Sequence, residues 1–189
     1  MFSERVLCAG FGGQGVMSIG QLLAYAGMIE DRQVTWIPSY GPEMRGGTAY
    51  CSVVISDHEV GSPIVTTNAD SAIIMNLPSL HKFESSVKPG GNILLNSSLI
   101  DCKVKRSDLN AHYVAAGELA NHCGNQQAAN IVILGAYMAL AAPVCFDSII
   151  QSLPKVFGKK SEKFMALNRE ALHLGAEAIL GPPKLLAAA

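Results

Sequence analysis

The feature that most constrains how this chain can fold is a glycine-rich stretch behind a short apolar segment near the amino terminus. Residues 6–9 (VLCA) predict a buried strand, and glycines follow at positions 10, 12, 13 and 15. From Val16 to Ala26, apolar residues recur every three or four positions, which predicts a helix. A strand, a glycine turn and a helix in this order are typical of nucleotide-binding α/β folds, in which the amino end of the helix faces an anion.

Only half of a dinucleotide-binding fingerprint is present. Positions 10, 12 and 15 meet the spacing G-x-G-x-x-G. An Asp or Glu normally stands at the end of the second strand and binds the ribose hydroxyls. Here Ser39 and Tyr40 occupy that place, at the end of a strand predicted over residues 34–39. Asp31 comes too early and Glu43 lies beyond a Gly-Pro turn, so the pattern argues against a free NAD site.

The loop after this second strand is the other unusual stretch, residues 39–48 (SYGPEMRGGT). Doubly wound sheets place their ligands at loops that follow the strands. In one interpretation, Arg45 and the amides of Gly46 and Gly47 meet an anion or a partner chain. In the other, the loop is a surface turn with a solvated Glu43–Arg45 pair.

The rest of the chain alternates between strand and helix patterns. Strands are predicted over residues 49–56, 69–76, 92–97 and 112–116, and helices over 77–87, 118–122, 128–142, 146–157 and 160–180. Residues 88–91 predict a turn, and residues 57–61 predict a hairpin-like turn into an extended segment, hence an antiparallel component. We therefore expect a three-layer α/β/α Rossmann-like domain with a mostly parallel sheet, some antiparallel strands and a helical C-terminus. A single domain is expected over residues 1–181, with a disordered tail over 182–189.

The charge content of the chain restricts the kinds of partner that it can bind. Charged residues make up only 15% of the chain, against an average of about 25%. Either part of the surface is buried in a larger assembly or the core is rich in small residues, and composition leaves both open. The net charge of −1 gives no basic surface for nucleic acid. We expect no membrane span and no leader peptide, and therefore a cytoplasmic protein.

No catalytic or metal-binding motif is apparent. The five cysteines contain no C-x-x-C pair, which argues against a disulfide framework, a zinc ribbon or a ferredoxin-type cluster. Gly15 is followed by Val16 and Met17, so the loop is not a P-loop. We predict a binding module without catalytic residues or metal ligands. Asn130, near the start of the apolar helix predicted over residues 128–142, either bonds a facing loop or, preferably, caps that helix.

Two of these stretches together resemble a known family. The segments GFGGQGV at residues 10–16 and SYGPEMRGGTAYCSVVIS at residues 39–56 closely resemble the gamma subunit of the 2-oxoacid:ferredoxin oxidoreductases. That family includes pyruvate, 2-oxoglutarate, 2-oxoisovalerate and indolepyruvate enzymes. The similarity extends to ADSAIIMN at 69–76, KPGGNILLNSS at 88–98 and NIVILGA at 130–136. The paired motifs are far more specific than a lone glycine fingerprint.

The resemblance implies a multi-subunit enzyme that oxidatively decarboxylates a 2-oxoacid to an acyl-CoA and passes the electrons to ferredoxin. Thiamine diphosphate and iron–sulfur clusters would be held by the alpha, beta and cluster-carrying subunits, and none by this chain alone. A stand-alone chain of this length favours 2-oxoglutarate or a branched-chain acid over pyruvate. The residues expected to meet coenzyme A or partner subunits are Gly12, Gly13, Gln14, Gly15, Tyr40, Glu43, Arg45, Gly46, Gly47 and Asn130.

A free-standing protein that holds a nucleotide or a flavin on the loop at residues 10–15 is the alternative. The missing ribose-binding acid and the low charge content both favour the subunit interpretation. The two family-like segments at residues 10–16 and 39–56 make it the preferred one. Gln14 is the side chain in the glycine loop that should be tested first for contact with coenzyme A or a partner subunit.

Overall fold

A mixed sheet of six strands forms the centre of the molecule. The computed structural model describes residues 1–41, 47–158 and 164–181. The strands lie in the order β2-β3-β1-β4-β5-β6. They are β1 (Ser3–Phe11), β2 (Gln33–Tyr40), β3 (Thr48–Ser56), β4 (Ala69–Ile74), β5 (Val87–Asn96) and β6 (Asn110–Val114).

Strand directions place most of the strand ends at one edge. Strands β1, β4, β5 and β6 are parallel, whereas β3 is antiparallel to both β1 and β2. The carboxyl ends of β1, β2, β4, β5 and β6 therefore lie at the same edge, which we call the carboxyl edge. The expected mostly parallel sheet with an antiparallel component is confirmed.

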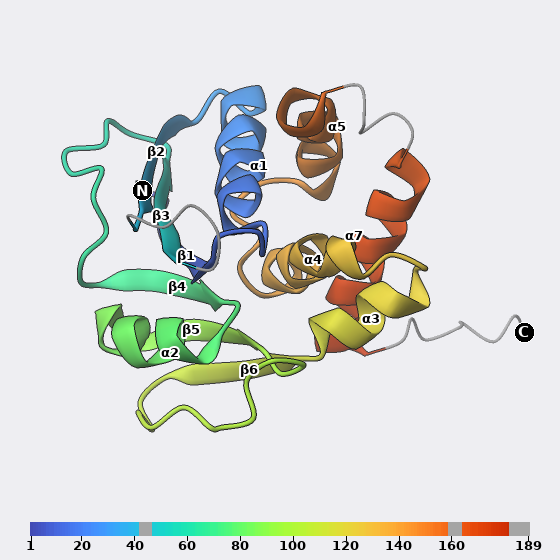
Figure 1. The fold of residues 1–189 in the computed structure, drawn as a ribbon. Helices are drawn as coiled ribbons and strands as arrows, with labels where there is room; N and C mark the ends of the chain where they lie inside the picture. Colours follow the sequence, from blue (N-terminus) through green and yellow to red (C-terminus); the bar gives the residue numbers. More distant parts are fainter. Residues whose placement is uncertain (42–46, 159–163, 182–189) are drawn as a thin grey trace, which may run out of the picture.

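Helices cover the two faces of the sheet unequally (Figure 1). One face carries α1 (Val16–Ile29), α3 (Ala116–His122) and α4 (Ala129–Ala141), with α5 (Phe146–Phe157) and α7 (Met165–Leu180) packed outside them. The other face carries α2 (Leu77–Phe83), followed by a 3-10 turn over Glu84–Ser86. The three-layer α/β/α arrangement with a helical C-terminus is therefore present.

The alternation of β1 side chains divides the core in two. Val6 and Cys8 pack with the helices of the α1 and α4 side. Leu7 and Ala9 point to the opposite face, where Leu80 of α2 is buried with them. All four strand residues are fully buried because both faces of the sheet are covered. The two clusters make β1 the central element that the glycine loop continues.

Helix α4 is apolar on every side because α7 covers the flank that the sheet leaves open. Gly135 of α4 lies against the backbone of Leu172, and Gly175 of α7 lies against the backbone of Val132. A β-carbon built on either glycine would lie 2.7 Å from the carbonyl carbon that it faces. The two helices cross at a distance that only glycine permits.

Two local predictions are wrong. Residues 88–91 do not form a turn between elements but lie within β5, where a register shift against β4 and a positive φ of 74° at Gly90 accommodate the glycines. Residues 57–68 contribute no strand, so the antiparallel component comes from β3, which pairs with β1 and with the preceding strand β2, and not from the turn predicted at residues 57–61. In both places, glycine and proline indicate an irregular backbone, but they do not determine whether it is a turn, a bulge or an extended loop.

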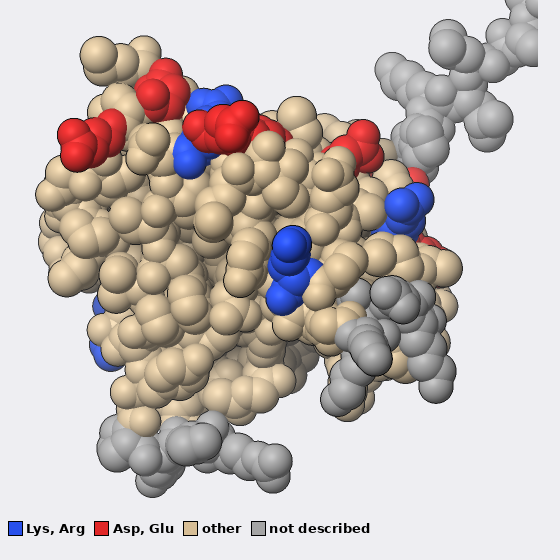
Figure 2. All heavy atoms as spheres, turned by 90° about the horizontal axis from the view of Figure 1, so that it is seen from above, with Lys and Arg blue, Asp and Glu red and all other residues tan. Residues whose placement is uncertain are grey.

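The face seen in Figure 2, which looks down on Figure 1 from above, carries few charged side chains across its middle, while acidic side chains gather along one edge. Exposed apolar side chains occur on the elements at the top of Figure 1, α1 and β2: Tyr25, Met28, Ile29, Ile37 and Tyr40. Within the described residues, no helix combines the length and apolar character needed to cross a bilayer.

A half-buried carboxyl lies at the amino end of the sheet. Oε1 of Glu4 accepts hydrogen bonds from the hydroxyls of Ser71, at 2.7 Å, and Tyr137, at 3.1 Å. Burial raises the pKa of the Glu4 carboxyl, and the nearby carboxylate of Asp70 adds to the effect. The pKa of the fully buried Tyr137 is raised as well, again chiefly by burial.

This carboxyl predicts a pH dependence of stability. A raised folded-state pKa favours the protonated form, so Glu4 contributes stability below the ordinary carboxyl pKa of 4.5 and loses it as pH rises through the raised value. We expect the unfolding free energy of Glu4→Gln, minus that of the unsubstituted chain, to increase from pH 4 towards pH 7. Urea unfolding across this range, with Glu177→Gln on the exposed side of α7 as the charge control, measures it. A difference that is flat with pH would contradict the assignment.

Candidate functional site

The site lies at the carboxyl edge, between β1 and β4. The connection after β1 runs through α1 to β2 on one side, whereas the connection after β4 runs through α2 to β5 on the other. The crevice outside such a switch point is where open α/β sheets bind their ligands. The glycine loop, residues 10–15, opens directly into it.

Glycine is required at two positions of this loop. Gly13 has a φ of 102°, and Gly15, which is the N-cap of α1, has a φ of 75°. A side chain at either position would be strained. Around Gly13 a β-carbon would meet nothing within 4 Å, so the loop there is open to a ligand. No side chain of the described residues caps α1, which leaves the first N–H groups of the helix facing the crevice.

The Gln14 side chain points inward and ties the loop to β4. Its Oε1 accepts hydrogen bonds from the backbone N–H of Phe11, at 2.7 Å, and from Nδ2 of Asn76, at 3.0 Å. Its Nε2 donates to the carbonyl of Met75 at 3.3 Å. The described contacts of this side chain are therefore structural, and they fix the position of the loop. Its predicted contact with a ligand stays a prediction.

The two glycine-containing loops meet. The N–H of Gly12 donates to the carbonyl of Gly47 at 3.0 Å, and the N–H of Gly41 donates to the carbonyl of Thr48 at 2.9 Å. Tyr40 ends β2 at the same edge with 62% of its surface exposed. The structure therefore brings the two loops together at these residues. Glu43, Arg45 and Gly46 lie outside the described residues.

Asn130 is not a helix cap, so the preferred prediction for this residue is wrong. Helix α4 begins at Ala129, with Ala128 as its N-cap, because a 3-10 turn over Gln126–Ala128 leads straight into it. Asn130 is 7% exposed, and its side chain packs against Gly15. A β-carbon at Gly15 would lie 2.8 Å from Cβ of Asn130. The structure thus brings Asn130 to the glycine loop.

Two cavities of about 480 Å³ each open on either side of Asn130. The α7 cavity lies between α1, α4, α5 and α7, and the β5 cavity lies between the glycine loop, β5 and α3. The α7 cavity is lined by Gly13, Gly15, Ser18, Asn125, Gln127, Ala128, Asn130, Ile131, Phe157, Phe164 and Asn168. The β5 cavity is lined by Gly13, Gln14, Met75, Asn96, Ser98, Leu99, Gly117, Glu118, Asn121, Gln126, Gln127, Ala129 and Asn130. Both volumes fall in the range of small-molecule sites.

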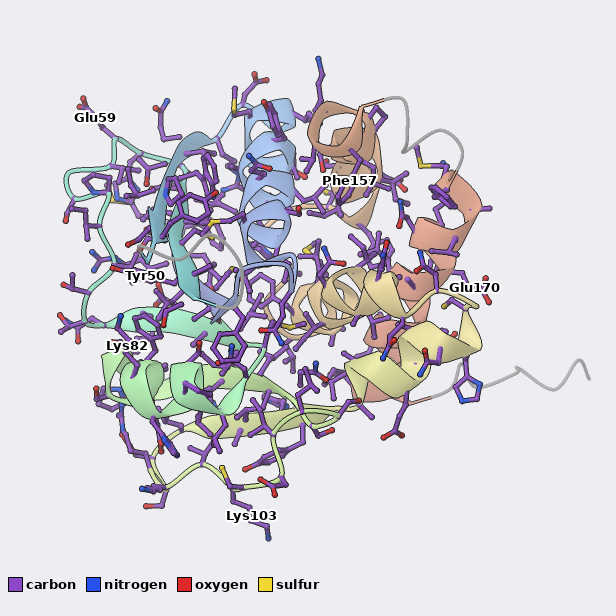
Figure 3. The ribbon with its side chains drawn as sticks, in the orientation of Figure 1. Tyr50, Glu59, Lys82, Lys103, Phe157 and Glu170 are labelled. Atoms are coloured by element: carbon purple, nitrogen blue, oxygen red, sulfur yellow. The ribbon has the colours of Figure 1, made fainter. Side chains whose placement is uncertain are left out.

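Neutral amides dominate these walls, and sequence reasoning missed most of them. Among the described lining residues, Glu118 is the one that carries a charge. Asn125 caps the 3-10 turn before α4 and Gln127 belongs to it, and nothing in the sequence places them beside the glycine loop. Asn168 sits in an ordinary amphipathic helix, so no sequence signal distinguished it. Figure 3 shows Phe157 on α5, across the sheet from Tyr50 and Lys82.

The fold and the site define a Rossmann-like binding module whose glycine loop and neighbouring amides surround a crevice at the carboxyl edge. Residues 5–178 match the family described as pyruvate ferredoxin/flavodoxin oxidoreductase. The chain belongs to this family.

Individual relatives agree with that membership. The ketoisovalerate oxidoreductase subunit VorA of Methanothermobacter marburgensis is 40% identical over 173 residues, which is 92% of this chain and 36% of that protein. The chain therefore spans about a third of the length of this relative. The gamma subunit of a keto/oxoacid ferredoxin oxidoreductase from Geobacter sulfurreducens is 30% identical, with a TM-score of 0.80 over 95% of this chain and 99% of that one.

A third protein shares the fold. It is a 2-oxoglutarate:ferredoxin oxidoreductase from Magnetococcus marinus, solved with 2-oxoglutarate, coenzyme A and succinyl-CoA bound. Its TM-score is 0.85 at 22% identity, over 97% of this chain and 32% of that chain.

Proposed function

We propose that the chain is the gamma component of a 2-oxoacid:ferredoxin oxidoreductase and that its carboxyl edge helps to bind coenzyme A. The observation that carries the proposal is the crevice around Asn130, where the glycine loop, uncapped N–H groups of α1 and neutral amides face open space. Coenzyme A offers amides and an adenine for such groups and phosphates for the helix amino end. The Magnetococcus marinus protein of the same fold has coenzyme A bound, which supports this ligand class.

The chain would contribute binding and orientation, while other subunits supply the redox chemistry. Among the described residues, no group of three His, Cys, Asp or Glu side chains is placed to hold a metal ion. In this proposal, thiamine diphosphate and iron–sulfur clusters belong to the alpha, beta and cluster-carrying chains, as the family resemblance implies. These cofactors would supply the chemistry for decarboxylating the 2-oxoacid and for transferring its electrons to ferredoxin. We favour 2-oxoglutarate or a branched-chain acid over pyruvate, which the ketoisovalerate relative supports.

Two features support partner subunits. The strand β2 lies at one end of the sheet, and it contains no charged residue. Beside it, Met28 of α1 is 60% exposed. Uncharged edge strands and exposed apolar side chains are commonly covered by another chain. A cytoplasmic location is proposed with the same complex.

Reconstitution tests the function. We expect the chain to co-purify with alpha, beta and cluster-carrying subunits and to be required for acyl-CoA formation when the complex is assayed against a panel of 2-oxoacids with ferredoxin. If the protein instead runs alone and binds NAD or FAD tightly, the subunit proposal fails and the free-standing nucleotide-binding protein replaces it. The acid that gives the highest kcat/KM identifies the substrate.

Arg45 provides a sharper test within the complex. We expect Arg45→Ala to weaken assembly or to raise the KM for coenzyme A about tenfold, because an arginine paired with a phosphate or carboxylate contributes on the order of 1.5–3 kcal/mol. Lys103→Ala, on the far loop labelled in Figure 3, controls for the loss of one positive charge. Unchanged assembly and turnover in Arg45→Ala would assign Arg45 to a solvated turn.

A further inference from the structure

Two buried cysteines lie directly opposite each other on neighbouring strands. Cys8 of β1 and Cys51 of β3 are partners in the antiparallel register, and both are fully buried as free thiols. The pKa of the Cys8 thiol is raised well above its usual range, first by a hydrogen bond with the Cys51 thiol and then by burial. The two sulfur atoms are therefore neighbours, although neither contributes to the site at the carboxyl edge.

The spacing of this pair suits a disulfide. Directly opposite side chains in an antiparallel pair have their β-carbons about 4.5–5.5 Å apart, whereas a disulfide needs about 3.5–4.5 Å. Both side chains belong to the core cluster on the α1 and α4 side, so they point to the same face of the sheet. An approach of β1 and β3 by roughly 1 Å would bring the two sulfur atoms to bonding distance.

Helix α1 covers the thiol pair in the folded chain. It packs on Cys51 at Gly20, where a β-carbon would lie 2.5 Å from Sγ of Cys51 and 2.8 Å from Nε1 of Trp36. The Cys51 thiol also donates a hydrogen bond to the carbonyl of Val16 at 3.5 Å. Buried thiols of this kind are inert, so the pair can react only when its cover opens.

The edge strand β2 provides a route for that opening. It pairs with β3 alone, at one end of the sheet. Two of its neighbouring side chains, Thr35 and Trp36, each bury a polar atom, Oγ1 and Nε1, that has no hydrogen-bond partner within the described residues. Water would pair with both atoms when β2 separates from β3, which reduces the free energy of opening.

We propose that Cys8 and Cys51 form an oxidation-sensitive disulfide that links β1 to β3 when a small disulfide reaches them in the opened state. One protein thiolate attacks a sulfur of the small disulfide, which releases one small thiol and leaves a mixed disulfide. The other protein thiolate attacks the protein-side sulfur of that bond and releases the second small thiol. The chain loses two electrons and two protons, and the oxidant is reduced to two thiols.

The link would join the two strands that lead into the glycine-containing loops. Cys8 precedes the glycine loop at residues 10–15, and Cys51 lies near the start of β3, which follows the second loop. The same loops are connected by the hydrogen bond from Gly12 to Gly47. A covalent bond close by would hold the loops together and constrain the unfolded chain between residues 8 and 51, which stabilises the fold. This inference concerns the chain by itself and does not depend on the oxidoreductase role.

Thiol counting on a variant that retains only this pair tests the link. The variant carries Cys102→Ser, Cys123→Ser and Cys145→Ser, at three positions that are not buried. After incubation with glutathione disulfide in urea below the unfolding transition, we expect the thiols counted in denaturant to fall from two per chain to none, with the chain still monomeric. Thiols that persist, or that end as mixed disulfides with glutathione, would overturn the proposal. Peptide mapping of the unsubstituted chain should recover residues 8 and 51 in one disulfide-linked fragment, which does not depend on the folding of the variant.

Stability distinguishes a disulfide of the native fold from one trapped during unfolding. We expect the oxidised variant to keep its circular dichroism spectrum, to unfold at a higher urea concentration than its reduced form, and to return to the reduced midpoint after treatment with dithiothreitol. The matched control adds Cys51→Ser to the same variant and should gain no stability from oxidation. An oxidised form that is no more stable than the reduced form would show that the native strands do not accept the bond, and the proposal would fail.

Discussion

Replacing Gly175 by Ala is expected to lower the free energy of unfolding by about 3 kcal/mol, the upper end of what overpacking usually costs. Alanine is the better helix former by about 1 kcal/mol, so helix propensity alone would predict a gain. The crossing with α4 makes the change in unfolding free energy unfavourable, because a β-carbon at Gly175 would lie 2.7 Å from the carbonyl carbon of Val132 and closer still to its oxygen. Backbone atoms cannot turn away as a side chain can. Urea unfolding followed by circular dichroism measures the change.

A second helical glycine supplies the matched control. In Gly117→Ala of α3, the new β-carbon would lie 3.1 Å from Cβ of Ser98, a small side chain at the end of a loop. We expect that variant to remain within about 1 kcal/mol of the unsubstituted chain. If Gly175→Ala and Gly117→Ala behave alike, the tight crossing of α4 and α7 is not a determinant of stability.

Gly15→Ala is expected to have the largest effect on the site. The alanine would hold a φ of 75°, and its β-carbon would displace the Asn130 side chain, because it would lie 2.7 Å from Cγ, 2.8 Å from Cβ and closer still to Nδ2. We expect a loss of about 1–3 kcal/mol of stability from the strained backbone and the overpacking. Because the first N–H groups of α1 would also move, we expect the KM for coenzyme A in the reconstituted complex to rise at least about tenfold.

Two further variants separate the contribution of backbone strain from that of the steric conflict with Asn130. Gly13→Ala has a similarly unfavourable φ of 102° but meets nothing within 4 Å, so it carries the backbone strain without the steric conflict. Adding Asn130→Ala to Gly15→Ala removes the conflict and should recover part of the stability, giving a favourable coupling energy in the double-mutant cycle. Additive effects in that cycle would show that the contact between Gly15 and Asn130 does not shape the loop.

The sheet and the order of its elements could be predicted because they depend on local patterns. The apolar run at residues 6–9 and the periodic helix after it are set by side-chain spacing, which survives in any tertiary context. The glycine loop was recognisable for the same reason. The direction of β3 could not be predicted, because the side-chain pattern of a strand is the same whether it runs parallel or antiparallel to its neighbours. Only the pairing with those neighbours determines the direction.

The candidate site was predicted in part. Gly12, Gly15 and Gly47 do lie together at the carboxyl edge, because β1 ends where its antiparallel neighbour β3 begins. Asn130 is expected in the site from the family resemblance, whereas its position near the predicted helix start suggests a cap, which a preceding 3-10 turn rules out by shifting the helix start. Asn168 was missed because its place in the lining of the α7 cavity arises from the packing of α7 against α4, which no local pattern records.

The tight crossing of α4 and α7 also sets how far apart the two asparagine side chains of the α7 cavity lie. Asn130 and Gly135 belong to α4, while Asn168 and Gly175 belong to α7. Whatever sets the distance between these two helices therefore sets the separation of the two amides. Relatives with a larger residue at either glycine would hold the amides further apart and so accommodate a wider ligand. Ligand preference in this cavity is thus expected to be tuned from positions that never touch the ligand.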